Sequence, residues 1–337
     1  MSPGRRRSPD LDEDDIRVRP GRGSRPRTKE RPRHDDATSA VVTTIDRGRY
    51  TCLVGDGDEQ REVTAMKARE LGRRAVVVGD RVWLVGDVSG APDTLTRIVR
   101  VSPRASALRR TADDSDPVER VIVANADQLV VVTSTANPEP RPRLVDRCLV
   151  AAYDAGLDPL LCITKTDLAP PDQLLDSYRN LALPWVATCE GAIPEQLAAR
   201  LRDRRSVLVG HSGVGKSTLV NALVPGADRA VGRVNPVTGR GRHISASAIA
   251  LPLPGGGWVI DTPGVRSFGL AHVDPGHILN AFPDLAEGAA GCPRGCPHTA
   301  GALDCALDAW VASGKADPAR LASFRRLLAS RDRHAGD

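Results

Sequence analysis

The chain has 337 residues, which is enough for two or three domains, and its 41% hydrophobic and 26% charged residues are ordinary for globular protein. No apolar run reaches the roughly 18 residues of a membrane span, and the N-terminus is basic rather than signal-like. We therefore expect a cytoplasmic protein with no membrane partner. The net charge of +5, from 47 basic and 42 acidic residues, is too small to indicate a nucleic-acid partner by itself.

Arginine dominates the basic residues, with 42 arginines and five lysines. A GC-rich genome produces this bias without any function, and an RNA partner would also favour arginine for phosphate and base contacts. Both explanations stay open. Three of the seven cysteines cluster near the C-terminus, and the other four lie in apolar stretches. These four are predicted to be small buried thiols in a reducing compartment: Cys52, Cys148, Cys162 and Cys189.

Residues 1–38 carry almost no apolar side chains and alternate arginine-rich with acidic blocks. Such a segment buries too little surface to offset its ordering entropy, so we predict a disordered tail. A basic arm that touches RNA and a tail that only improves solubility both fit this composition.

Residues 39–103 form short β-rich runs broken by glycine and aspartate, which predicts a small β-barrel, with an OB-fold as the leading fold. That fold often binds oligonucleotides, but a fold alone supports only an analogy. The segment holds two aromatic residues, Tyr50 and Trp83, so base stacking is not strongly indicated. The predicted strands are 40–45, 49–54, 62–64, 75–78, 81–85 and 94–99.

Residues 104–118 are arginine-rich and then aspartate-rich, which predicts a linker. Residues 119–270 alternate strand and helix patterns and predict an α/β layer with a largely parallel sheet. Apolar residues at helical spacing predict a helix over 144–155 that Gly156 ends. The predicted strands of this layer are 129–133, 160–163, 207–209 and 258–260.

Residues 271–337 contain a cluster of three cysteines and one histidine: Cys292, Cys296, His298 and Cys305. Three thiolates and an imidazole are a normal tetrahedral set for one structural zinc ion, and four protein ligands leave no open position for catalysis. A reduced, metal-free loop is the alternative.

A helix is predicted after this cluster, capped by Asp317 and begun by Pro318. Its apolar face carries Leu321, Phe324, Leu327 and Leu328. Arg294 and the arginines of this helix would then be available to contact RNA.

A phosphate-binding loop follows the strand at 207–209 and fits the pattern G-x-x-x-x-G-K-[ST]. Glycines let backbone N–H groups curl around phosphates, and the N-terminus of the following helix adds positive potential. Lys216 would reach the β- and γ-oxygens, and Ser217 would hold Mg²⁺. The predicted phosphate-binding residues are Gly210, His211, Ser212, Gly213, Val214, Gly215, Lys216, Ser217 and Thr218.

A second nucleotide motif, D-x-x-G, follows the strand at 258–260. Asp261 would meet Mg²⁺ directly or through water, and the N–H of Gly264 would sense the γ-phosphate. The four-residue match is weak alone, but its position after a phosphate loop and at a strand end supports the assignment.

A third motif, Thr164, Lys165, Thr166 and Asp167, ends the strand at 160–163 and fits [NT]-K-x-D. The Asp167 carboxylate would accept two N–H bonds from guanine, and the Lys165 stem would cover the base. Adenine lacks that pair of donors, so Asp167 would select GTP over ATP. Residues 186–188 lie where a loop behind the guanine is expected.

This third motif, residues 164–167, is called the base reader below. It precedes the phosphate loop by about fifty residues, the reverse of the order in Ras-like proteins. In this order the chain resembles the circularly permuted GTPases, specifically the small ribosomal subunit-dependent GTPase A family, over roughly residues 40–330. Its most specific pieces are 124–128, 164–167, 210–217, 239–243, 253–257, 261–266 and the Cys/His cluster. The resemblance implies an N-terminal OB-fold, a permuted GTPase domain, a C-terminal zinc domain, and a role in late small-subunit maturation with subunit-stimulated hydrolysis.

The chain departs from this family in the switch region. Where the family has three threonines after Gly-Arg-His, this chain has Ile244, Ser245 and Ala246. Ser245 is the first candidate Mg²⁺ ligand, and Ser247 is the alternative. Val265 replaces the glutamine that orients water in many Ras-like enzymes, and the resemblance points to His243 as the catalytic residue. We therefore expect slow intrinsic hydrolysis that a partner accelerates.

The leading hypothesis is thus a GTPase that uses GTP/GDP and Mg²⁺, binds the small ribosomal subunit and its rRNA, and acts as a monomer. A second hypothesis is a GTP-sensing RNA-binding factor with negligible turnover. A more distant one is a P-loop kinase or ATPase. Hydrolysis that is stimulated by the subunit and lost in Lys216→Ala would reject the RNA-binding factor without turnover. Equal competition of ATP with GTP would favour the kinase or ATPase, and a change of base preference in Asp167→Asn would argue against it.

Overall fold

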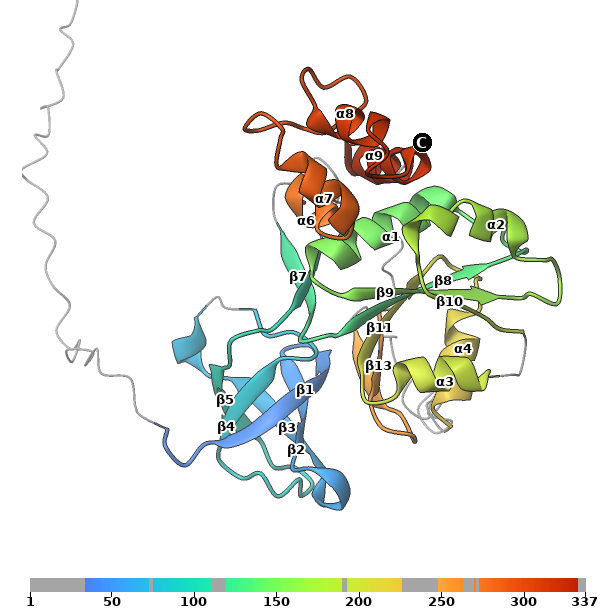
Figure 1. Ribbon diagram of the computed structural model, residues 1–337. Coiled ribbons are helices and arrows are strands. Elements are labelled where there is room, and N and C mark those ends of the chain that lie inside the picture. The colour runs from blue at the N-terminus through green and yellow to red at the C-terminus, as the bar shows by residue number, and fades with distance from the viewer. Residues whose placement is uncertain are drawn as a thin grey trace, which may run out of the picture. The chain divides into compact units, whose positions relative to one another are not determined.

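The computed structural model describes residues 34–72, 75–110, 119–189, 193–225, 248–262, 270 and 273–332 (Figure 1). The chain divides into two compact units, residues 1–35 and 36–337. The predicted tail lies outside the described residues up to position 33, as does the linker segment 111–118. Every element named here belongs to the second unit.

A closed five-stranded barrel forms the first part of this unit. Its strands pair in the order β1-β2-β3-β5-β4, and β4 pairs again with β1 to close the circle. The β3–β5 pair is parallel and the others are antiparallel, as in an OB-fold, which confirms the predicted barrel. The strands are β1 (Thr38–Asp46), β2 (Arg49–Val54), β3 (Arg61–Lys67), β4 (Arg81–Val85) and β5 (Thr96–Val101), with 3-10 turns at η2 (Gly57–Glu59) and η3 (Arg69–Leu71).

Alternate residues of these strands point inward and make the barrel core. Val42, Cys52, Val82 and Ile98 are fully buried there. Burial raises the pKa of the Cys52 thiol to about 12, so this cysteine packs as an apolar side chain, as predicted.

The strand predicted at residues 75–78 is wrong. Of these residues, only Val78 makes a β-bridge, an isolated one to Val123. The N–H of Val77 donates to the buried carboxylate of Asp80 at 2.8 Å, which folds the segment into a tight turn before β4. Arg104 pairs with that carboxylate at 2.7 Å and neutralises it. The valines at 76–78 have the composition of a strand because they are buried in the core, but their backbone forms a turn.

A mixed sheet of six strands forms the α/β layer, in the order β10-β9-β8-β11-β13-β12. The first five strands run parallel and β12 is antiparallel. The sheet continues into the barrel through one register pair, Thr44 of β1 with Ile249 of β12. The strands are β8 (Gln128–Ser134), β9 (Asp158–Thr164), β10 (Trp185–Ala187), β11 (Arg205–Gly210), β12 (Ile249–Pro252) and β13 (Trp258–Asp261).

Helices cover both faces of this sheet, with α1 and α2 on one side and α3 and α4 on the other (Figure 1). The faces alternate along β8: Leu129 and Val131 pack in the core with α1, and Val130 and Val132 pack with α3 and α4. This two-sided burial explains the continuous apolar strands. The helices are α1 (Pro142–Asp154), α2 (Asp172–Asp176), α3 (Glu195–Leu201) and α4 (Lys216–Leu223), with a 3-10 turn at η4 (Arg179–Leu181).

Part of the predicted linker is a hairpin instead. Strand β6 (Ala107–Arg110) pairs antiparallel with β7 (Arg120–Ala124). Leu108 is buried in the core beside α1, which explains why this arginine-rich stretch is ordered. The charged residues on both sides of Leu108 removed the alternating apolar pattern by which a strand is predicted, because only one side chain of β6 is fully buried.

Within the described residues, four helices follow the sheet. None of the helices in these ranges is long and apolar enough to cross a bilayer. The last begins as predicted, because the N–H of Ala319 donates to the Asp317 carboxylate at 2.7 Å. Its predicted apolar face is buried and packs on α1. The helices are α6 (Pro275–Leu279), α7 (Pro283–Ala289), α8 (Ala306–Ala312) and α9 (Pro318–Asp332).

Three arginines of α9, which the sequence suggested were available for RNA, pair with carboxylates of the same chain. Arg320 pairs with Asp284 of α7 at 2.8 Å, and Arg325 pairs with Asp308 of α8 at 2.8 Å. Arg326 pairs with the buried Asp146 of α1 at 3.2 Å. Burial raises the pKa of Asp146, and the charge of Arg326 opposes that shift. These guanidiniums therefore fix α9 in place.

Asn125 joins the turn before β4 to the strands of the α/β layer. Its side-chain amide donates to the carbonyl of Gly79 at 2.8 Å and accepts from the N–H of Ala105 at 2.9 Å. Gly79 has a φ of +87°, and a Cβ there would lie 2.0 Å from the carbonyl oxygen of Ala124. Only glycine fits at this joint.

We predict that Gly79→Ala destabilises the protein by roughly 3–5 kcal/mol, because it adds a steric clash to backbone strain. Gly48→Ala is the matched control: Gly48 has a φ of +81° and open space around its Cβ position. It should cost roughly 1 kcal/mol, the strain alone. Urea unfolding of both variants measures the difference, and equal costs would show that the close approach to Ala124 is not tight.

Candidate nucleotide site and zinc centre

The phosphate loop joins the end of β11 to the start of α4. Gly213 and Gly215 have φ values of +84° and +89°, so this path needs residues without a side chain. A Cβ on Gly210 would lie 2.5 Å from the carbonyl oxygen of Val132 in β8. The loop therefore runs against the neighbouring strand and leads directly into the N-terminus of α4. That arrangement suits an anion.

Lys216 and Asp261 come together at this edge. They form an ion pair, and each side chain is 14% exposed. Asp261 ends β13, the strand next to β11, and Thr262 after it donates to the carbonyl of Leu208 at 2.9 Å. Side chains of the phosphate loop and of the D-x-x-G motif thus meet at this edge.

The oxygen donors at this edge fit Mg²⁺. Ser217 lies exposed on the first turn of α4, and the Asp261 carboxylate lies beside the loop through its contact with Lys216. Hydroxyl and carboxylate oxygens are ligands that Mg²⁺ prefers, together with waters and substrate phosphates. Residues 263–269 and 226–247 lie outside the described residues, and with them Gly264, His243 and Ser245.

The base reader touches the phosphate loop directly. The Thr164 hydroxyl donates to the carbonyl of Val214 at 2.6 Å, and the Lys165 ammonium donates to that of Gly213 at 2.8 Å. The threonine at position 164 therefore supplies a donor to the loop. Two consecutive carbonyls of the phosphate loop are held by two consecutive base-reader residues.

A pocket of about 360 Å³ opens between the base reader, the loop after β10 and helix α4. Thr166 ties two of its walls together, because its N–H and its hydroxyl reach the carbonyl of Thr188 at 3.3 and 3.2 Å. The exposed Asp167 carboxylate lies at its rim. The pocket is lined by Thr164, Lys165, Asp167, Leu168, Thr188, Cys189, Ile193, Gly215, Thr218, Leu219 and Ala222.

Several residues of this site were missed in the sequence. Leu168 and Ile193 supply apolar walls, and Cys189, predicted to be buried, is exposed in the pocket. Thr135 and Asn137 border the base reader from a loop after β8. The signal available was topological: a polar run that follows a strand next to the phosphate-loop strand lies at the same edge.

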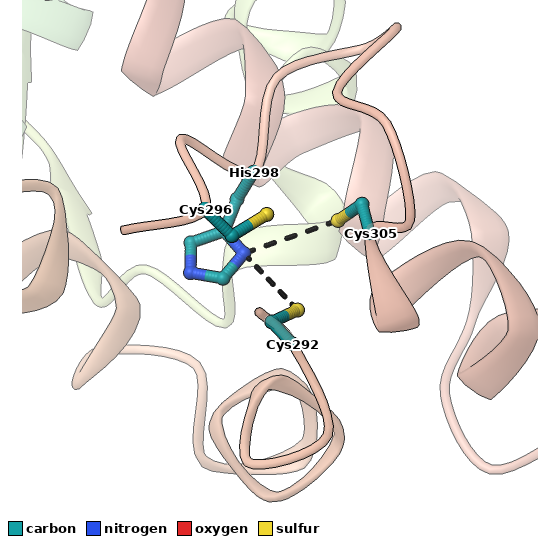
Figure 2. A group of neighbouring side chains, drawn as sticks. All are labelled: Cys292, Cys296, His298 and Cys305. Carbon is teal, nitrogen blue, oxygen red and sulfur yellow. Dashed lines mark hydrogen bonds between the residues drawn. The ribbon is translucent and has the colours of Figure 1, made fainter. Parts of the chain in front are cut away.

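The four cluster residues converge near the start of α8 (Figure 2). Their ligand atoms all lie within 4.8 Å of one another. The Nδ1 atom of His298 is 3.5 Å from Sγ of Cys292 and 3.9 Å from Sγ of Cys305. In a tetrahedral zinc site with ordinary bond lengths, nitrogen and sulfur ligands are about 3.6 Å apart. The donor set therefore fits one zinc ion with Cys296 as its fourth ligand.

Neighbouring groups support these ligands. The N–H of Ala306 donates to Sγ of Cys292 at 3.3 Å, and the Arg325 guanidinium reaches Sγ of Cys305 at 3.9 Å. Such donors stabilise thiolates. Burial, and then the charge of Arg325, lower the pKa of His298, which favours the neutral imidazole that binds metal.

Comparison with known proteins settles the family. A family model described as RsgA GTPase matches residues 101–271, about half of the chain. The chain belongs to the RsgA GTPase family. As a member of this family it is a GTP-hydrolysing enzyme, and the motif order seen here is that of a circularly permuted GTPase.

Relatives cover most of the chain. The small ribosomal subunit biogenesis GTPase RsgA of Pseudomonas aeruginosa is 40% identical over 266 residues, 76% of each protein. The protein of the same name from Chlorobaculum parvum is 37% identical over 310 residues, 88% of this chain and 99% of that one.

Two solved structures share the fold. YloQ, a circularly permuted GTPase, superimposes with a TM-score of 0.62 at 23% identity and covers 90% of this chain and 98% of its own. YjeQ from Thermotoga maritima gives 0.64 at 24% identity, with 88% and 98% covered.

We predict that the purified protein carries about one zinc ion and that Cys296→Ser loses it, because three ligands bind zinc far more weakly than four. Cys189→Ser is the control, since Cys189 is exposed and outside the cluster. Atomic emission spectroscopy measures zinc per chain. Limited proteolysis should cut residues 292–305 in Cys296→Ser and spare them in the control. A full zinc content in Cys296→Ser would contradict the site.

Proposed function

We propose that this RsgA-family GTPase acts in late maturation of the small ribosomal subunit, binds that subunit and its rRNA, and hydrolyses GTP faster when bound to it. The observation that carries the proposal is the meeting of Lys216, Asp261 and the base reader at one sheet edge in permuted order. The names of the relatives supply the ribosomal context. We further propose that the protein is a cytoplasmic monomer.

In the proposed site, Lys216 and the N–H groups of the phosphate loop bind the β- and γ-phosphates. Ser217 and Asp261 would hold Mg²⁺, with Ser245 as a further ligand, and the ion would offset charge on the phosphate oxygens. Lys216 and Asp261 form an ion pair at this edge, so the cation that would bind the phosphates and the carboxylate that would bind Mg²⁺ lie side by side. Gly264 would report the γ-phosphate through its N–H.

The guanine base would occupy the pocket beside Asp167. The carboxylate accepts the two N–H groups of guanine, and the Lys165 stem covers one face of the ring. Cys162 and the other buried strand residues behind the base reader give it a rigid support. Thr164, Thr166 and Thr188 fix the backbone rather than read the base.

Hydrolysis itself would depend on His243, since Val265 has no polar group to orient water. We therefore propose slow turnover by the free protein and faster turnover on the subunit. A GTP-sensing RNA-binding factor without turnover is the alternative function, and membership of a GTPase family does not favour it.

We propose three functional domains, with bounds at 39–103 for the barrel, 119–270 for the GTPase and 271–337 for the zinc-binding part, preceded by the tail at 1–38. Strand β6, between the first two, packs with the GTPase core through Leu108. The barrel presents Trp83 with the Arg100 guanidinium 4.3 Å from its ring centre. Arginine stacked on an aromatic ring suits contact with RNA. One structural zinc ion would fix the loop that carries Arg294.

Phosphate release from GTP tests the proposal. We expect purified small ribosomal subunits to raise the rate at least tenfold, and large subunits to leave it unchanged. Lys216→Ala should abolish both the basal and the stimulated rate, because it removes the cation at the phosphates. GTP binding without acceleration by either subunit would support the non-hydrolysing alternative.

Base selectivity forms a separate prediction. Asp167→Asn should weaken GTP binding at least tenfold and improve binding of xanthosine triphosphate, because an amide N–H can donate to the extra ring oxygen of xanthine. Competition binding with GTP, ATP and xanthosine triphosphate measures the change. Equal binding of ATP and GTP by the unmodified protein would contradict a guanine site and favour a P-loop kinase or ATPase.

A further inference from the structure

A loop after β8 contacts both the base reader and the phosphate loop. The Ser134 hydroxyl donates to the carbonyl of Pro138 at 2.7 Å, which closes residues 134–138 into a compact turn. The Pro138 ring lies 3.5 Å from the position of a Cβ on Gly213, so the turn stands directly against the phosphate loop. None of the three nucleotide motifs includes these residues.

Thr135 is the residue of this turn that holds the base reader. Its N–H donates to the carbonyl of Thr164 at 3.1 Å, and its hydroxyl donates to the carbonyl of Lys165 at 2.5 Å. Two successive carbonyls of the base reader are thus bound by one residue.

Lys165 needs such support because its backbone is strained. Its φ is +58°, a left-handed conformation that residues other than glycine rarely adopt and that persists where surrounding contacts hold it. This conformation carries the side chain across to the phosphate loop. There the ammonium meets the carbonyl of Gly213 at 2.8 Å and also the carbonyl of Asn137, in the same turn as Thr135. The turn therefore binds Lys165 at both its backbone and its tip.

We propose that Thr135 is a positioning residue for guanine binding, acting through Lys165. Its hydroxyl holds the left-handed backbone of Lys165, so that the lysine stem lies over the base pocket before nucleotide arrives. The inference rests on the proposed guanine site. It adds a fourth segment to the three sequence motifs, one that acts by setting the backbone geometry of Lys165.

The matched test removes one hydroxyl. Thr135→Val keeps the size and branching of the side chain and loses the donor, and Thr135→Ser keeps the donor. Thr43→Val is the control, because the Thr43 hydroxyl likewise donates to a backbone carbonyl, that of Thr51 at 3.2 Å in the barrel. Fluorescent GDP and GTP analogues report Kd, and thermal unfolding without nucleotide reports folding.

Thr135→Val should raise Kd about three- to tenfold, the loss expected for one hydrogen bond. Thr135→Ser and Thr43→Val should bind as the unmodified protein does. With small ribosomal subunits, KM for GTP should rise by the same factor at unchanged kcat. The thermal midpoint of Thr135→Val without nucleotide should match that of Thr43→Val, which separates positioning from a general loss of stability.

A double-mutant cycle tests whether Thr135 acts through Lys165. In a Lys165→Ala background, Thr135→Val should change Kd by less than twofold, because the side chain that it positions is gone. Multiplicative effects in the double variant, or an unchanged Kd in Thr135→Val, would overturn the inference and leave the GTPase proposal standing. Absence of guanine-nucleotide binding by the unmodified protein would overturn both.

Discussion

The nucleotide site depends on parallel pairing among four neighbouring strands, β9, β8, β11 and β13. Parallel strands end at one edge, so whatever follows each strand is brought together there regardless of its place in the chain. Lys165 follows β9, the Thr135 turn follows β8, the phosphate loop follows β11 and Asp261 closes β13. Strand order in the sheet, rather than motif order in the chain, sets the geometry, and this is why a permuted sequence can build the same site.

The sequence was most informative where chemistry restricts the residue. The motifs of the phosphate loop, the base reader and the Cys/His cluster stand out in the sequence because phosphate, guanine and zinc each accept few side-chain types, and the structure brings the residues of each motif together. The closed barrel and the cap at Asp317 were also predicted correctly. These elements follow from local patterns: alternation of inward side chains in strands, and an aspartate before a proline at a helix start.

The errors share a physical cause: partners distant in sequence decide the outcome. Residues 75–78 have the composition of a strand, but Asp80 and Arg104 make them a turn. The segment at 107–110 has the composition of a linker, but Leu108 packs in the core and makes it a strand. Thr135 belongs to no sequence motif. Its contact with Lys165 exists because β8 and β9 are neighbours in the sheet. Ion pairs and strand order join residues that are far apart in the chain, so local sequence patterns do not predict them.

The arginines of α9 have a consequence for how the protein meets polyanions. A guanidinium already paired with a carboxylate must give up that partner before it can neutralise a phosphate, so a phosphate that approaches gains little from it. Arg320, Arg325 and Arg326 are in this condition. In the proposed contact with rRNA, salt sensitivity should therefore follow the guanidiniums that carry no carboxylate partner rather than the total arginine content. Arg320, Arg325 and Arg326 contribute to the internal packing of α9 more than to electrostatic attraction.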